Sequence, residues 1–107
     1  PELTAIKSTK LFLELAENLD LDTDRILVVI NQATLPGSIK AQKIEEFLKL
    51  ESSHAIPHDP RLHFAINRGT AICLTEPGAP SATAIFKLAR HLLERIRASR
   101  LRDDDIF

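Results

Sequence analysis

Apolar residues in the first part of the chain follow two different spacings, and each spacing predicts one element. Residues 3–19 show the i, i+3, i+4, i+7 spacing that gives a helix one buried face. Residues 26–30 are consecutive apolar residues, most of them β-branched, which is typical of a strand buried on both faces. Residues 20–24 predict a polar turn between the two. The predicted buried face of the helix consists of Phe12, Leu15, Ala16 and Leu19.

A second helix and a second strand are predicted next. Residues 38–48 predict a helix with Ser38 as its N-cap, because a serine hydroxyl can accept hydrogen bonds from the first turn. Residues 54–56 form a short strand that Pro57 closes, since proline lacks the N–H that a ladder needs. The order strand, helix, strand predicts a right-handed βαβ crossover with parallel strands. The apolar stripe of this helix consists of Ala41, Ile44, Phe47 and Leu48.

The last third of the chain is predicted to be helical. Residues 60–67 predict one or two helical turns, which Gly69 terminates, and the stretch "TEPGAP" predicts a loop. Residues 81–100 predict a long helix with Ser81 as its N-cap. The predicted buried stripe of this helix consists of Ala82, Ile85, Phe86, Ala89, Leu93 and Ile96.

These elements predict an α/β fold in the order α-β-α-β-α-α, with two short parallel strands flanked by about four helices. Residues 103–107 are predicted to form a frayed acidic tail. Two short strands make an incomplete sheet, because independent stability usually needs three or more strands or helix cover. We therefore expect the chain to associate with itself, either as a homodimer or as a dimer that exchanges elements.

Composition narrows the class of protein further. The chain has 107 residues and a net charge of −1, so it has no overall attraction to nucleic acid or to an anionic membrane. Its single cysteine, Cys73, cannot form an internal disulfide, which fits the cytoplasm. Pro1 stands where an initiator methionine is usual, so we expect the chain to be part of a longer protein.

Polar residues follow both predicted strands. Asn31 comes directly after the first strand, and Pro57, His58 and Asp59 follow the second. Ligands of open parallel sheets bind beyond the carboxyl ends of the strands, where these residues would share one crevice. An amide both donates and accepts, which suits the edge of a nucleobase. The alternative is that Asn31 only begins a turn.

Three stretches resemble the MinD/ParA family of P-loop ATPases, and within it the CpaE-like proteins of pilus and secretion assembly. The stretch "RILVVINQ" resembles the family's strand followed by asparagine. The stretch "IPHDPRLHFAINRGTAICLTEPGAPSATAIFKLARHL" is similar to its proline–aspartate turn, Asn-x-Gly, proline-bearing loop and last helix. The stretch "PELTAIKSTKLFLELAENLDL" looks like the helix before the strand. Together they cover nearly the whole chain.

The resemblance implies the C-terminal half of a SIMIBI-class nucleotide-binding domain, in a protein that positions cellular cargo or assembles pili. It assigns adenine recognition to Asn31 and the lining of the base to Pro57, His58 and Asp59. It also implies ATP and Mg²⁺ in the intact parent, with the upstream half of the domain, a second copy and proteins of the pilus or secretion machinery as partners. The family often has arginine where this chain has Gln32.

The glycine-rich loop that binds phosphates is absent from this sequence. Its three glycines, Gly37, Gly69 and Gly78, form no Gly-x-x-x-x-Gly-Lys-Ser/Thr motif. We therefore expect the chain alone to have no ATPase activity and to hold no tightly bound cofactor. The alternative is a non-catalytic, degenerate ATPase-like module that works through dimerisation and protein contacts.

Two further groups of residues have less specific interpretations. His54, His58 and His63 with Asp59 could suggest a metal site, but they fall on three predicted elements, so separate surface histidines are the favoured interpretation. The basic stretch Lys87–Arg102 could bind nucleic acid or an anionic membrane. A solvated helix face explains this stretch more simply.

Overall fold

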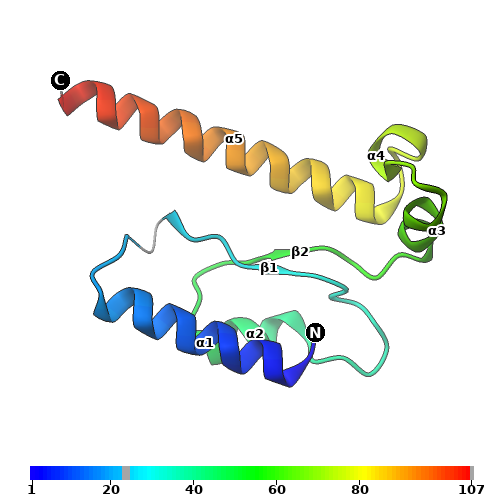
Figure 1. Cartoon of the computed structure of the whole chain (residues 1–107), viewed down its shortest axis with the longest axis horizontal. Helices are drawn as coiled ribbons and strands as arrows, with labels where there is room; N and C mark the ends of the chain where they lie inside the picture. Colours follow the sequence, from blue (N-terminus) through cyan, green and yellow to red (C-terminus); the bar gives the residue numbers. More distant parts are fainter. Residues whose placement is uncertain (23–24, 107) are drawn as a thin grey trace. The chain divides into compact units, whose positions relative to one another are not determined.

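The computed structural model describes residues 1–22 and 25–106, and the chain forms two compact units, Pro1–His58 and Asp59–Phe107 (Figure 1). They are called the first and the second unit. The predicted turn over residues 20–24 lies partly outside the described residues, as does the end of the predicted tail at Phe107.

The first unit contains a parallel β–α–β arrangement that is preceded by a helix. Its elements are α1 (Leu3–Asn18), β1 (Val29–Ile30), α2 (Ala41–Leu48) and β2 (His54–Ala55). The strands are parallel, with Val29 opposite His54 and Ile30 opposite Ala55. The predicted pairing is therefore confirmed. Both strands are shorter than predicted, because each can extend only as far as its single partner bonds with it.

The core of the first unit lies on one side of the two strands. Figure 1 shows α1 and α2 on the same side of β1 and β2. The buried core cluster takes residues from both helices and from β1 and consists of Ile6, Ile30, Ile44 and Leu48. The helices also meet at their surface, where the Lys10 ammonium nitrogen lies 4.2 Å from the centroid of the half-exposed Phe47 ring. Phe47 was predicted to be buried, and that prediction is wrong.

The predicted buried face of α1 is wrong in three of its four residues. Ala16 is buried, whereas Phe12, Leu15 and Leu19 are more than half exposed. The competing stripe that contains Ile6 and Leu13 packs against the sheet instead, because α1 carries apolar residues over a wide arc and the unit offers only one surface to cover. For the same reason Val29 is 40% exposed, although the strand was predicted to be buried on both faces.

The start of α2 also differs from the prediction. Ser38 lies outside the helix, and its N–H donates to the carbonyl of Leu35 over 3.0 Å in a turn. The N-cap position is taken by Lys40, whose side chain makes no capping hydrogen bond. The prediction that Ser38 caps this helix is therefore wrong, because α2 begins only at Ala41 and a turn closed by the Ser38 N–H precedes it.

The second unit is helical throughout its described elements, which are α3 (Pro60–Arg68), α4 (Ile72–Thr75) and α5 (Pro80–Ile106). Gly69 ends α3 with a φ of 69°, a left-handed conformation that glycine adopts without strain, as predicted. The short helix α4 was not predicted. The helix α5 continues past residue 100 through most of the stretch predicted to fray. The buried core cluster of the second unit consists of Ala65, Ile72, Ala79 and Ala82.

The predicted buried stripe of α5 is correct only at its beginning. Ala82 is buried and Ile85 packs against the core cluster. The rest of the stripe is exposed at Phe86, Ala89, Leu93 and Ile96. Within the second unit α4 contacts α5 and α3 contacts α4, near the N-terminal end of α5 (Figure 1). Among the described elements of this unit, none covers the later turns of α5.

The contrast between the two apolar faces of α1 can be tested by mutation. Ile6→Ala should lower the free energy of unfolding by about 2–5 kcal/mol, because it leaves a cavity in the core of the first unit. Leu3→Ala, at a side chain that is 55% exposed in the same helix, should change it by about 0.5 kcal/mol or less. Urea unfolding followed by circular dichroism gives both values. Equal losses in the two variants would contradict the assignment of the buried face.

Candidate functional site

The loops that follow β1 and β2 are bonded to each other. The Ala33 N–H donates to the Ile56 carbonyl over 2.9 Å, and the His58 N–H donates to Thr34 Oγ1 over 3.0 Å. These two bonds continue the strand pairing beyond the sheet. They bring the segment from Asn31 to Thr34 beside the segment from Ile56 to His58, at the carboxyl ends of both strands.

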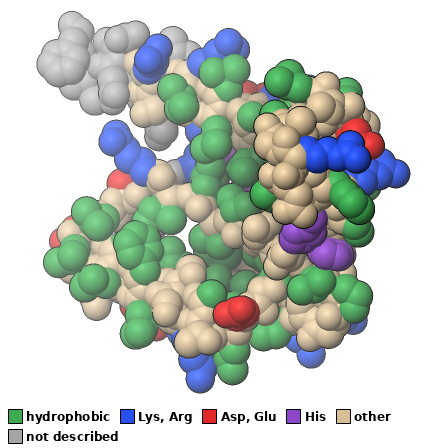
Figure 2. All heavy atoms as spheres, turned by 45° about the vertical axis from the view of Figure 1, so that its right-hand side comes forward, with side chains coloured by type: hydrophobic (Ala, Val, Ile, Leu, Met, Phe, Trp, Pro, Cys, Tyr) green, Lys and Arg blue, Asp and Glu red, His purple; other side chains and the backbone are tan. Residues whose placement is uncertain are grey.

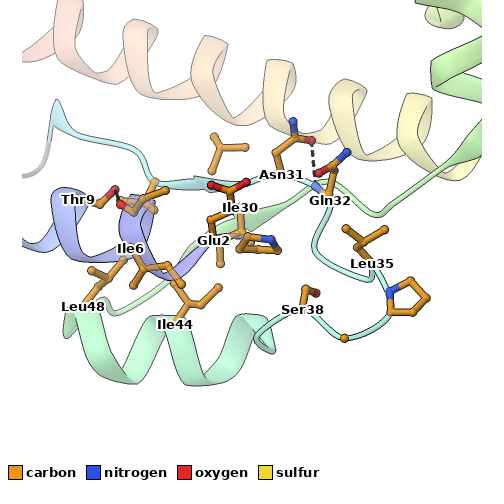
Figure 3. A pocket seen from close by; sticks show the side chains of 16 residues that line it. Glu2, Ile6, Thr9, Ile30, Asn31, Gln32, Leu35, Ser38, Ile44 and Leu48 are labelled. Carbon is orange, nitrogen blue, oxygen red and sulfur yellow. Dashed lines mark hydrogen bonds between the residues drawn. The ribbon is translucent and has the colours of Figure 1, made fainter.

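Asn31 is exposed and takes part in a local turn. Its Oδ1 atom accepts from the N–H of Gln32 over 3.0 Å, and Gln32 adopts a left-handed conformation with a φ of 51°. The amide NH₂ group of Asn31 makes no hydrogen bond to another described residue. Figure 3 shows the Asn31 side chain pointing away from Ile6 and Ile44, so it leaves β1 on the side opposite the core. Asn31 therefore forms a turn, and the two N–H groups of its amide remain available to a ligand.

Pro57 and His58 are both half-buried in the loop after β2. Pro57 has no N–H to donate, and the backbone N–H of His58 is used by Thr34. This part of the predicted site is thus held in place by main-chain geometry. A ligand at this point would meet the ring of the proline and the imidazole of the histidine.

Asp59 belongs to the second unit, where both oxygens of its buried carboxylate accept hydrogen bonds. Oδ1 accepts from the Arg61 N–H over 3.0 Å, which caps α3. Oδ2 accepts from the Ser81 hydroxyl over 2.7 Å and from the Ser81 N–H over 3.2 Å, in the first turn of α5. One carboxylate therefore joins the starts of two helices.

The hydroxyl of Ser81 is the main cause of a lowered pKa at Asp59. The backbone N–H groups of Ser81 and Arg61 and the Arg61 charge act in the same direction, while burial opposes them. Ser81 is fully buried inside α5 and is not its N-cap, so that prediction is wrong. The sequence signal for the capping role of Asp59 was the Asp-Pro pair at the start of α3.

The structure also contains a cavity of about 580 Å³ in the first unit that sequence reasoning did not find (Figure 3). One wall is a face of α1 and another is the stretch Val28–Gln32, while α2 contributes the buried Ile44 and Leu48. No sequence pattern marks such a cavity, because it depends on how α1 lies beside β1.

The remaining candidate groups lie apart or make local contacts. Among the described residues no group of three or more histidine, cysteine, aspartate or glutamate side chains could hold a metal ion. Cys73 is half-buried in α4 and packs against the core cluster of the second unit. Lys87, Arg90 and Arg100 are exposed on α5, and Arg102 lies beyond the side chains that the structure describes. None of the described helices combines the length and the apolar character needed to span a membrane.

Comparison with known proteins gave no match: no family model, no curated protein and no solved structure matches this chain. The interpretation of the site therefore depends on its geometry and on the resemblance of its motifs.

The Asp59 carboxylate should make the stability of the helices depend on pH. Because its pKa is lower in the folded chain than the ordinary 3.8, its stabilising effect is present above that value and is lost as the pH falls below it. Asp59→Asn should lower the melting temperature at neutral pH by several degrees and weaken its fall as the pH drops below the ordinary pKa of 3.8. Thermal unfolding followed by circular dichroism measures both. Glu14→Gln, at an exposed carboxylate of α1, is the control and should leave the pH profile unchanged.

Proposed function

We propose that this chain supplies the adenine-side contacts of a nucleotide site in a MinD/ParA-like ATPase of the CpaE-like kind, used in spatial positioning or in pilus or secretion assembly. The observation that carries the proposal is the parallel pairing of β1 and β2, with bonded loops at their carboxyl ends. Open parallel sheets bind ligands at that end.

The proposed contacts follow from the hydrogen bonds that each residue already makes within the chain. The free NH₂ donors of Asn31 would bind ring nitrogens of the base, and Pro57 and His58 would line it. Asp59 directs both carboxylate oxygens to Ser81 and Arg61, so its proposed contribution is to hold the chain that follows His58. The phosphate-binding loop, Mg²⁺ and the catalytic groups would come from the upstream half of the domain, in the cytoplasm.

Adenosine binding by the chain itself tests the proposal. We expect a dissociation constant on the order of millimolar, because a base without bound phosphates makes few contacts. Asn31→Ala should weaken binding about fivefold or more, the cost of one lost hydrogen bond. Chemical-shift perturbation of the amides of Asn31, Gln32 and His58 by NMR measures both.

Asn18→Ala, which changes an exposed asparagine at the end of α1, is the matched control and should bind adenosine as the unchanged chain does. The chain should release no phosphate from ATP. The proposal is wrong if adenosine shifts none of the three amides, or if Asn31→Ala binds as tightly as the control.

A second candidate is a non-catalytic interaction module, and the exposed apolar side chains favour it (Figure 2). On α1 and directly after it, Leu11, Phe12, Leu15 and Leu19 form a continuous exposed face. Large exposed apolar patches mark interaction surfaces, and a second copy presents the same face.

Sedimentation velocity separates this candidate from a monomer. We expect a dimer at micromolar concentration and a monomer for Leu15→Glu, because a carboxylate would be buried without a partner in the shared face. Lys7→Gln changes the net charge by the same amount on the polar side of α1 and should remain dimeric. A monomer at all concentrations would exclude self-association through this face.

A further inference from the structure

The cavity of the first unit runs along the free edge of β1. Five consecutive residues, Val28–Gln32, line it. Side chains of a strand alternate between its two faces, so consecutive residues can share one wall only if the backbone edge itself forms that wall. No residue of β2 lines the cavity, which therefore lies on the side of β1 away from β2. We call this cavity the edge groove.

Unbonded backbone groups of β1 point into the edge groove. Toward β2, the carbonyls of Val28 and Ile30 accept from the N–H groups of His54 and Ile56 over 3.0 and 2.9 Å. Because backbone polar groups of successive strand residues point to opposite edges, the N–H and carbonyl of Val29 point to the free edge. Neither group of Val29 is bonded to another residue in the part of the chain that the structure describes. A donor and an acceptor at strand spacing recognise one more strand.

The side chains on the other walls of the edge groove determine which side chains a bound strand should have. The wall opposite the edge consists of Ala5, Ile6 and Thr9 of α1 and of Pro1 and Glu2, which precede that helix. Ile44 and Leu48 extend the apolar surface beneath it (Figure 3). Glu2 is the single charged side chain among the described lining residues. A fitting strand therefore places an apolar side chain toward Ile6 and Ile44 and a basic one beside Glu2.

A second copy of the chain does not fit this edge as a whole. Two identical strand edges that pair symmetrically run antiparallel about an axis perpendicular to the sheet, so both copies carry their helices on the same face. Four helices, each about 10 Å wide, would then share the space under four strands spaced about 4.8 Å apart. The helix α1 already occupies the position beneath the added strand. A lone extended segment brings no helices and meets no such obstacle.

We propose that the edge groove binds an extended segment of another protein as a third strand beside β1, with an apolar residue toward Ile6 and Ile44 and a lysine or arginine beside Glu2. This proposal rests on the second candidate function, the interaction module, because an upstream half of the ATPase domain would supply the rest of the sheet and use this edge. Peptide binding and adenosine binding can fail separately, since Val29 and Asn31 present different groups to the two ligands. Backbone hydrogen bonds would supply affinity, and the apolar and basic positions would supply selectivity.

The probe is a fluorescent seven-residue peptide of alternating threonine and valine that ends in lysine, titrated with the whole chain and followed by anisotropy. Val29→Pro removes the edge N–H, and an edge strand tolerates proline there because that N–H takes no part in the β1–β2 ladder. We expect Val29→Pro to weaken binding at least about tenfold. Glu2→Gln should weaken binding a few-fold and reduce its sensitivity to salt.

Ala55→Pro is the matched control, because the N–H of Ala55 points to the far edge of β2, outside the edge groove. It should bind the peptide as the unchanged chain does. Should Val29→Pro fail to fold, a peptide with methylated backbone nitrogens tests the same hydrogen bonds on the unchanged chain and should not bind. The proposal is overturned if the two proline variants bind equally well, or if the methylated peptide still binds. It is also overturned if the unchanged chain binds no peptide at millimolar concentration, or if the Val29 amide is protected only in a dimer of the chain.

Discussion

Backbone pairing between β1 and β2 is the interaction on which the described features of the first unit depend. It places the loops after the two strands side by side, and it orients β1 so that Ile30 faces the core. The same alternation that turns Ile30 inward turns Val29 outward, and the same ladder that uses the carbonyls of Val28 and Ile30 leaves the polar groups of Val29 at the other edge. A shift of one residue in the pairing of β1 would reverse the directions of the Val29 and Ile30 side chains and the edges to which their backbone groups point.

The second unit depends on a different interaction, the carboxylate of Asp59. Helix starts leave backbone N–H groups without partners, and a charged oxygen acceptor is strong enough to hold two starts together. The unit has a small core in which alanine predominates, so packing alone contributes little to it. The fully buried hydroxyl of Ser81 needs an acceptor, and Asp59 provides one. The Asp59 carboxylate therefore has a structural role in the second unit.

Local sequence patterns predicted which elements form. They did not predict which side chains are buried, because burial depends on the elements that pack around them. The helix stop at Gly69 was predicted because glycine adopts a positive φ without strain, and the strand pair was predicted from the order strand, helix, strand. The Asp-Pro pair carried a signal for the cap at Asp59, but that cap was not predicted. Phe12 and Leu15 have the spacing of a buried face, but so have Ile6 and Leu13, and only the sheet selects between the two stripes. The bonds between Asp59 and Ser81 join residues 22 positions apart, and no local pattern reveals such a contact. The edge groove depends on the placement of α1 and was likewise unreadable.

The two proposals use different groups of β1 and of the turn that follows it. Asn31 offers side-chain donors beyond the carboxyl end of the strand, on the side away from the core, whereas Val29 offers main-chain groups along the free edge. A base needs directional donors at one point, and an added strand needs a row of alternating donors and acceptors. The Val29 groups are unbonded because two strands are too few to satisfy the backbone of β1 on both edges. The Asn31 donors have a different origin, because only the Oδ1 atom of that side chain takes part in the turn with Gln32. One substitution therefore should not remove both sets of groups.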